Sequence, residues 1–306
     1  MEKHCISTDG RHAVYAYAVE EVVPYINWVY FFHAWGFQPR FASIAHLHGC
    51  DACRAMWLAS FAEADRAKAA EAMQLHKEAL RLLRTEGKNL RIEGIFRLCR
   101  AQADEDDLWI EGTRFPLLRQ QLPDPTAGVC LCLSDFIRPI DDAQPDCIGL
   151  FAATVRGALK EEELKEHDPY AHLLMQTLSD RLAEAATEKM HEQIRKVDWG
   201  YAPHEDLTIP DLLQEKFQGI RPAVGYPSLP DQSVNFILDE LLQLKEVGIT
   251  LTEHGAMRPH ASVCGLMMAH PAARYFSVGT IGDDQLKDYA HRRGLPVEEL
   301  RKFLRM

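Results

Sequence analysis

The stretch DPYAHLLMQTLSDRLAEAATEKMHEQIRKV (Asp168–Val197) predicts the longest helix of the chain. Asp168 is a suitable N-cap, and Pro169 fits the first helical position because its missing N–H would be unsatisfied there anyway. Apolar residues then recur every four positions, which predicts one buried stripe along the helix. The residues of this stripe are Leu174, Leu178, Leu182, Ala186, Met190 and Ile194.

Short strand-like and helix-like blocks alternate on both sides of this helix and indicate an α+β fold class. The further expected helices span 54–84, ended by Gly87, and 233–247, ended by Gly248, with two short helices near the C-terminus. The expected strands span 13–19, 90–101, 108–111, 129–137, 146–155, 250–253, 262–268 and 275–281. The acidic turn Asp104–Asp107 predicts that 90–101 and 108–111 form a hairpin.

Composition favours a cytoplasmic protein with a sizeable core. The 306 residues contain no apolar run of membrane-spanning length, and MEKHCISTDGRH lacks the apolar segment of a signal peptide. The net charge of −11 argues against nucleic acid as a general partner, because phosphate binding needs a basic surface. The eight cysteines are scattered, which favours free thiols over a disulfide framework.

The segment Gly219-Ile-Arg-Pro-Ala-Val-Gly-Tyr-Pro227 has the composition of a loop that holds a small anion. Arg221 offers a planar set of donors suited to a carboxylate. Gly225 permits a turn or a close backbone approach, and Tyr226 adds an aromatic face with a hydroxyl. On residue types alone, a Pro/Gly-rich connector before the next helix is the simpler explanation of this segment.

Further motifs in a fixed order accompany this loop. They are VPYINWVYFF (23–32), DRLAEAATEKMHEQIRKVDWGYAPHEDL (180–207), LTEHGAMRPHASVCG (251–265), AHPAARYFSVGTIGDDQLKDYAHRRG (269–294) and PVEELRKFL (296–304). In this order the chain resembles the activation domain of cobalamin-dependent methionine synthase, which binds S-adenosylmethionine. The resemblance implies a central twisted antiparallel sheet flanked by long helices. It also implies one domain over 23–306, after a lead-in of residues 1–22.

The resemblance also implies a set of ligand-binding residues. Arg221 would bind the ligand carboxylate, and the backbone around Ala223 and Gly225 would lie against the adenine or ribose. An aromatic pair would contact the ligand, Tyr275 more directly than Phe276, and Tyr226 belongs to the same loop. Glu184, in RLAEA, would bind the ammonium group, although a helical glutamate ordinarily faces water. Glu215 would orient Arg221 or face water.

Two positions depart from the family pattern. Asn27 stands where the family has an aspartate that pairs with the positive end of the ligand. Loss of that charge would weaken binding about tenfold to a hundredfold. Gln232 stands where the family often has a histidine associated with signalling between modules.

A separate cluster, His46, His48, Cys50 and Cys53, forms H-x-H-G-C-x-x-C, with the ligand types and spacing of a metal or redox-thiol site. The resembled family has an ordinary connector there, so the site assignment contains no metal. No general base is expected either, because in the family the cobalt is the nucleophile and the protein positions the methyl donor.

Three functions follow as alternatives. The first is a stand-alone methyltransferase component of methionine biosynthesis. It would bind S-adenosylmethionine and support reductive activation of cobalamin held by a separate methionine synthase, with a flavodoxin-like reductant. The second is a docking module with a weakened ligand site, and the third is a metal or thiol protein that uses 46–53. For the reductant, the basic residues of 291–293 with Arg301, Lys302 and Arg305 are the candidate contact, although solvated helix faces explain them as well.

Overall fold

The computed structural model describes the chain except for residues 1–11, 127, 158–167 and 305–306. Contacts divide it into two compact units, one of 1–15, 93–154 and 187–306 and one of 16–92 and 155–186. Strands β1, β2 and β5 and helix α6, whose bounds are given below, each contribute residues to both units. The expectation of a single domain over 23–306 therefore stays a prediction.

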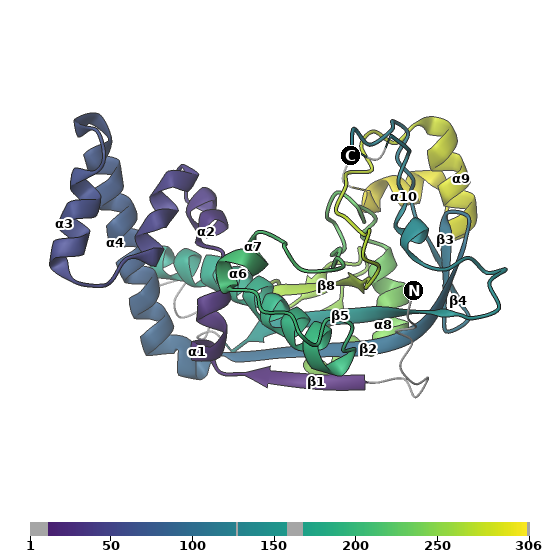
Figure 1. Ribbon diagram of the computed structural model, residues 1–306, viewed down its shortest axis with the longest axis horizontal. Helices are drawn as coiled ribbons and strands as arrows, with labels where there is room; N and C mark the ends of the chain where they lie inside the picture. The colour runs from purple at the N-terminus through teal and green to yellow at the C-terminus, as the bar shows by residue number, and fades with distance from the viewer. Residues whose placement is uncertain (1–11, 127, 158–167, 305–306) are drawn as a thin grey trace. The chain divides into compact units, whose positions relative to one another are not determined.

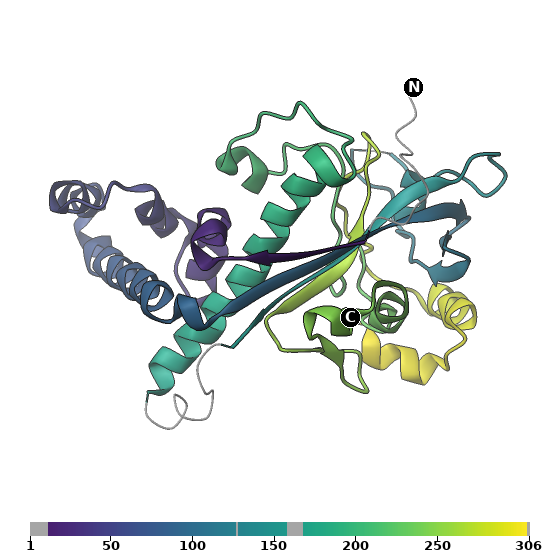
Figure 2. The same ribbon diagram turned by 90° about the horizontal axis from the view of Figure 1, so that it is seen from below.

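A six-stranded sheet has the order β4-β3-β2-β5-β8, with β1 paired to β2 (Figures 1 and 2). Its strands are β1 (His12–Tyr17), β2 (Arg91–Asp104), β3 (Asp107–Ile110), β4 (Thr113–Pro116), β5 (Asp146–Arg156) and β8 (Ser262–Met267). The pairs β2/β3, β3/β4 and β5/β8 are antiparallel. Both the α+β class and the hairpin around the acidic turn are confirmed.

Helix α6 (Pro169–Gln193) begins as expected, and a π-helical turn at Ile194–Asp198 covers the rest of the predicted span. Asp168 Oδ1 accepts a hydrogen bond from the Ala171 N–H at 2.9 Å, so Asp168 is the N-cap. All six residues of the predicted stripe are buried. Close to Met190 the sheet carries Gly94, where a Cβ would lie 2.8 Å from the Met190 sulfur. The end of the helix therefore packs against β2 through a glycine.

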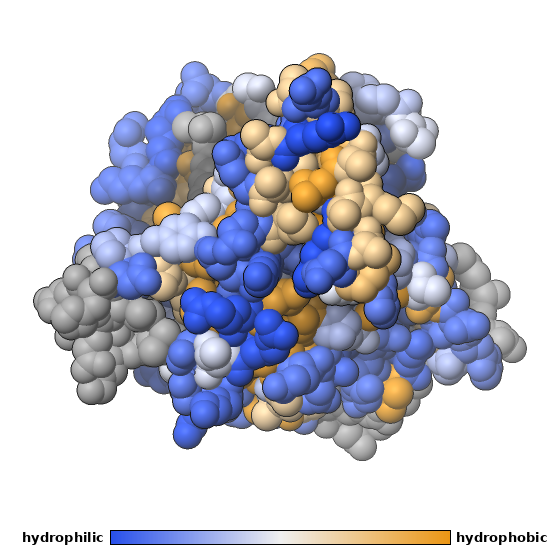
Figure 3. All heavy atoms as spheres, turned by 90° about the vertical axis from the view of Figure 1, so that its left-hand side faces the viewer, coloured by the Kyte–Doolittle hydropathy of each residue, from blue (hydrophilic) through white to orange (hydrophobic). Residues whose placement is uncertain are grey.

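The unit that contains 16–92 is mostly helical. Its elements are α1 (Val19–Val22), η1 (Val23–Tyr25), α2 (Trp28–Ala34), η2 (Pro39–His46), α3 (Asp51–Ala59), α4 (Glu63–Glu86) and η3 (Gly87–Asn89). The single helix expected over 54–84 is wrong, because α3 and α4 are separated at Ser60–Ala62. The Ser60 hydroxyl donates to the Trp57 carbonyl at 2.6 Å and competes with continuation of the helix. Met56 of α3 is 74% exposed. Figure 3, which views the molecule from the left-hand side of Figure 1, shows a tan and orange apolar area at its top.

The remaining elements belong to the other unit. They are η4 (Leu133–Phe136), α7 (Ile209–Leu213), α8 (Val234–Leu242), η6 (Leu244–Val247), β6 (Thr250–Leu251), β7 (Met257–Arg258), α9 (Asp283–Arg293) and α10 (Val297–Phe303). Two expected strands are wrong. The run 129–137 forms no strand and ends in a 3₁₀ turn because the Asp135 carboxylate accepts the Cys132 N–H, and 275–281 forms no strand either.

None of the helices in the described ranges combines the length and the apolar composition needed to cross a membrane.

Candidate functional site

The first half of the 219–227 loop lies against strand β8. Ile220 and Met268 exchange backbone hydrogen bonds at 2.9 Å in both directions. Further along, the Leu266 N–H donates to the Pro222 carbonyl at 3.0 Å, and the Val224 N–H donates to the Cys264 carbonyl at 2.9 Å. The loop is therefore held by backbone pairing to the sheet, which fixes the position of Arg221.

Two glycines make this close approach sterically feasible. A Cβ at Gly265 would lie 2.2 Å from the Pro222 carbonyl oxygen. Gly219 has φ +83°, and a Cβ there would lie 2.2 Å from the Met268 carbonyl oxygen. Gly265 was not a predicted site residue. Its only signal in the sequence is a glycine inside an apolar strand, which is typical of a close backbone contact.

The second half of the loop is a tight turn. Gly225 has φ +86°, and its N–H donates to the Leu229 carbonyl at 2.8 Å. Ala223 is buried beneath the turn, whereas Tyr226 is 48% exposed. A Cβ built at Gly225 would meet no atom within 4 Å, so there is open space beside the turn.

Arg221 forms an ion pair with Glu188, and the two side chains are 13% and 12% exposed. The Arg221 backbone N–H also donates to the Tyr275 hydroxyl at 3.0 Å. Burial raises the pKa of Tyr275 and the nearby Arg221 opposes this effect, so the phenol stays protonated at neutral pH. Glu188 was not a predicted site residue. It becomes apparent only when α6 is placed beside the loop.

Helix α6 presents His191 one turn after Glu188, in a neutral state. His191 is fully buried and its Nε2 lies 3.2 Å from the Tyr201 hydroxyl. Burial lowers its pKa well below the usual range, and the charges of Arg195 and Arg221 lower it further. His191 therefore adds no positive charge near Arg221.

Glu215 is an exposed residue in a turn. Partial desolvation raises the pKa of its carboxyl group, and the charge of Arg221 lowers that pKa.

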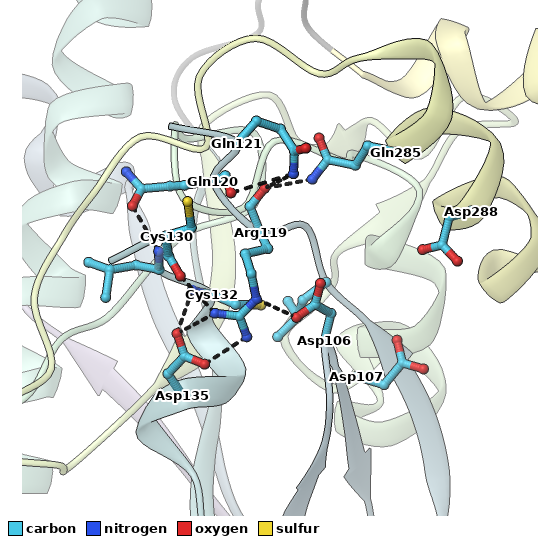
Figure 4. Close-up of polar contacts among 12 residues, drawn as sticks. Asp106, Asp107, Arg119, Gln120, Gln121, Cys130, Cys132, Asp135, Gln285 and Asp288 are labelled. Carbon is cyan, nitrogen blue, oxygen red and sulfur yellow. Dashed lines mark hydrogen bonds and ion pairs between the residues drawn. The ribbon is translucent and has the colours of Figure 1, made fainter. Parts of the chain in front are cut away.

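A polar network around Arg119 supports the segment that carries Tyr275 (Figure 4). The Arg119 guanidinium donates to Asp135 at 2.7 Å through two nitrogens and to Asp106 at 2.6 Å through Nε. The next residue, Gln120, donates to the Ser277 carbonyl at 2.9 Å. From there the Val278 N–H donates to the Pro227 carbonyl at 2.9 Å. The network thus links 275–278 to the end of the loop.

Comparison with known proteins identifies the family of this arrangement. The family model for the activation domain of vitamin B12 dependent methionine synthase matches residues 18–294. The chain belongs to this family.

A solved structure agrees with this assignment. It is a crystal structure of the MetH reactivation domain bound to AdoHcy, with 33% sequence identity to this chain. The match covers 99% of this chain and 93% of that chain, with a TM-score of 0.81. The expected resemblance and the expected antiparallel α+β fold are both confirmed.

In this member of the activation-domain family, one compact unit contains Arg221, Ala223, Gly225, Tyr226, Tyr275 and Phe276. Phe276 is 8% exposed and packs in the apolar core of that unit, whereas Tyr275 is half-buried with its hydroxyl on the loop backbone. The structure thus brings Tyr275 to Arg221. The role of Phe276 in ligand binding stays a prediction.

Asn27 and Glu184 belong to the other unit. Asn27 is the N-cap of α2, and its Oδ1 accepts the Val29 N–H at 3.1 Å. Glu184 is half-buried on α6, between the buried Ala183 and Ala185. Both remain predicted ligand contacts.

In this activation-domain chain, Arg292 and Arg293 do not lie on a solvated helix face, whereas His291, Arg301 and Lys302 are exposed. Arg292 bonds Asp107 at 2.5 Å, and Arg293 lies 3.2 Å from Asp231. Arg292 and Arg293 are 13% and 9% exposed, and Arg301 pairs with Asp283. Arg305 lies outside the described residues. These arginines bind acidic partners within the chain, which weakens the expectation that they form a docking patch.

The cysteine cluster of this family member is partly assembled. His48, Cys50 and Cys53 come together, whereas His46 is exposed at the end of η2 and does not join them. A hydrogen bond with His48, assisted by Cys53, lowers the pKa of Cys50 to about 7.

Proposed function

We propose that this chain binds S-adenosylmethionine at the 219–227 loop and supports reductive methylation of cobalamin held by a separate methionine synthase. The observation that carries this proposal is the position of Arg221. It is held by backbone pairing of its loop to β8 and by Glu188, and the same loop has open space at Gly225. Membership of the activation-domain family and the AdoHcy bound by a relative support the choice of ligand.

The ligand's groups match the residues of this unit. A carboxylate fits the planar donors of Arg221. The open side of Gly225 and the small side chain of Ala223 leave room for the adenine or ribose, with the exposed ring of Tyr226 next to them. Tyr275 presents an aromatic face, which favours a sulfonium by cation–π attraction. We assign Phe276 to the support of Tyr275 and to contact with the ligand.

The positive end of the ligand requires acceptors. We keep Glu184 as the partner of the ammonium group, and Asn27 as a weakened version of the family's aspartate. Glu188 has a different task. It neutralises the Arg221 guanidinium while the site is empty, since an unpaired buried charge costs several kcal/mol.

The protein's contribution to the chemistry is positioning, so no general base is assigned. When bound by the partner and reduced by one electron from a flavodoxin-like protein, cobalamin would supply the electron pair that accepts the methyl group, and this chain would hold the donor in position through Arg221. The electrons of the broken S–C bond stay on sulfur and yield S-adenosylhomocysteine. We place this methyltransferase component in the cytoplasm, in methionine biosynthesis.

The second candidate is a docking module that keeps the fold but binds S-adenosylmethionine poorly. Asn27 and Gln232 favour it, because both replace residues that the family pattern expects.

Calorimetric titration of S-adenosylmethionine into wild type, Arg221→Ala and Asn27→Asp separates the two. Micromolar binding that Arg221→Ala abolishes supports the first function. No binding to wild type, together with measurable binding to Asn27→Asp, supports the docking module. No binding to any of the three proteins would reject S-adenosylmethionine as the ligand.

The activity itself is tested in trans. The chain is added to a methionine synthase that lacks its activation domain and has been inactivated as cob(II)alamin, together with S-adenosylmethionine and a reductant. We expect the cob(II)alamin absorption to disappear with wild type and to persist with Arg221→Ala. Persistence with wild type would overturn action in trans even where binding is intact.

A further inference from the structure

Three metal-ligating side chains meet at the start of helix α3, in the unit that does not contain Arg221. The ligand atoms of His48, Cys50 and Cys53 all lie within 4.8 Å of one another. Cys50 and Cys53 are half-buried free thiols and His48 is exposed. The cluster therefore combines two sulfur donors and one imidazole within reach of solvent.

The backbone holds this cluster in place. Cys50 is the N-cap of α3, and its Sγ accepts the Cys53 N–H at 3.3 Å. The Cys50 N–H in turn donates to the His48 carbonyl at 2.8 Å, which folds His48 back toward the thiols. Capping gives both cysteines a common face at the first turn of the helix, so their convergence does not depend on long side chains.

The separations suit a tetrahedral ion. With Zn–S near 2.3 Å and Zn–N near 2.0 Å, the ligand atoms of a tetrahedral zinc site lie roughly 3.5–3.8 Å apart. The observed upper limit of 4.8 Å needs a closure of about an ångström, which side-chain rotation supplies. Two thiolates also balance the charge of a divalent cation.

We propose that His48, Cys50 and Cys53 bind one zinc-class cation, with water as the fourth ligand. Thiolate and imidazole donors select zinc and similar soft or borderline metals over magnesium or calcium. Three protein ligands with an open fourth position are the arrangement of solvent-accessible zinc sites rather than of closed structural ones. The inference does not depend on the proposed ligand site.

A neighbouring groove shares His48 with the cluster. A groove of about 480 Å³ is lined by His48, Gly49 and Arg54, with His76 and Lys77. The positive charges of Arg54 and Lys77 along this groove disfavour a second metal ion there.

A redox dithiol is the competing use of a C-x-x-C pair at a helix start. His48 separates the two: a metal site needs it as a ligand, whereas a disulfide forms without it.

The test uses the full-length purified chain, reduced and stripped of metal. Zinc is added, the protein is passed through gel filtration, and bound metal is measured by mass spectrometry. Cobalt replaces zinc in a parallel sample, because thiolate-to-cobalt absorption in the near ultraviolet reports sulfur ligation directly. We expect one equivalent of zinc per chain and this absorption in wild type.

The variants are Cys50→Ser, Cys53→Ser and His48→Gln, with Cys130→Ser as the matched control, because Cys130 is also a half-buried free thiol. We expect each ligand variant to bind zinc at least about tenfold more weakly, and Cys130→Ser to bind like wild type. Equal binding by Cys50→Ser, or no retained zinc in wild type, overturns the proposal. So does unchanged binding by His48→Gln. Isolation of a Cys50–Cys53 disulfide from protein that retains no zinc assigns the pair to redox chemistry instead. Circular dichroism of each variant separates loss of ligation from loss of folding.

Discussion

Glu188 of helix α6 forms an ion pair with Arg221 of the 219–227 loop, and both side chains are largely buried. The pair joins two segments 33 residues apart in sequence. It holds the Arg221 guanidinium against helix α6 and keeps its charge compensated. A ligand carboxylate that binds Arg221 therefore competes with Glu188 for the same donors.

Removal of Arg221 should affect S-adenosylmethionine selectively. We expect Arg221→Gln and Arg221→Ala to weaken its binding about tenfold to a hundredfold, since hydrogen bonds to charged groups contribute about 1.5–3 kcal/mol. Decarboxylated S-adenosylmethionine lacks the group that Arg221 binds, so its affinity should change little. Calorimetry with both ligands measures the difference. An equal loss for both ligands would contradict a carboxylate contact.

Glu188→Gln should lower the stability of the free protein and increase the stabilisation that S-adenosylmethionine produces. Without ligand, the variant should melt at a lower temperature than wild type, because Arg221 loses its buried anionic partner. S-adenosylmethionine should then raise the melting temperature by more than in wild type, because its carboxylate restores the compensation. Glu188→Asp, which keeps the charge, serves as the control. A smaller ligand-induced rise in Glu188→Gln would show that Glu188 contacts the ligand instead.

Asn27→Asp should strengthen binding without harm to the fold. Aspartate and asparagine are comparable N-caps, so the hydrogen bond from the Val29 N–H to residue 27 should persist. We expect a gain of about tenfold to a hundredfold in affinity for S-adenosylmethionine. Asn27→Ala, which loses the cap, should cost about 1 kcal/mol of stability with no gain in affinity. Calorimetry and urea unfolding report the two effects separately, and an unchanged affinity in Asn27→Asp would rule out residue 27 as a ligand contact.

Gly265→Ala should displace the loop from the sheet. The new methyl group would meet the Pro222 carbonyl, so we expect a loss of about 1–3 kcal/mol in unfolding free energy and weaker ligand binding. Gly225→Asn is the matched comparison, because open space surrounds Gly225 and asparagine tolerates a positive φ better than other side chains. Its stability should fall less than that of Gly265→Ala. Equal losses would mean that backbone conformation, rather than close approach, limits the loop.

His76 should make the protein less stable in mild acid. Burial, with the charges of Arg54 and His46, lowers the pKa of His76 from 6.5 to about 4. The folded state therefore binds the proton less readily than the unfolded state. The contribution of neutral His76 to the folding free energy is fully present above about pH 6.5, and it is lost as the pH falls toward 4. Between about pH 7 and about pH 5 the loss should be about 2 kcal/mol.

His76→Phe removes this titration and keeps a ring that can pack on Trp28, which now lies 4.5 Å from the His76 ring. Urea unfolding at several pH values should show a shallower decline for the variant than for wild type. The same slope in both proteins would assign the acid sensitivity to other groups, such as the buried His191.

Much of the secondary structure could be predicted because its causes are local. The Asp168 cap and the six-residue stripe define α6, and the acidic turn defines the β2–β3 hairpin. Predictions failed where a side chain's hydrogen bond interrupts a regular pattern, as Ser60 does between α3 and α4 and Asp135 does at Cys132. Such bonds compete with helix or strand pairing but leave hydrophobic periodicity unchanged.

Part of the 219–227 loop was also predictable from the sequence, because Arg221 and Gly225 have chemical and conformational properties of their own. Glu188 and Gly265 were not predicted. A helical glutamate and a glycine in a strand acquire meaning only from what lies opposite them. The basic residues at 292 and 293 suggested solvated faces and are instead buried against acids.

The sequence by itself thus determined the family, the α+β class, the long helix and the arginine-bearing loop, since each depends on residue types and spacing along the chain. Only the tertiary structure decided that Glu188 compensates Arg221, that Gly265 admits the loop, and that His48 joins Cys50 and Cys53 without His46. Those outcomes depend on distances between atoms that chain order does not specify. Ion pairing, steric exclusion and metal ligation all change steeply over an ångström or two.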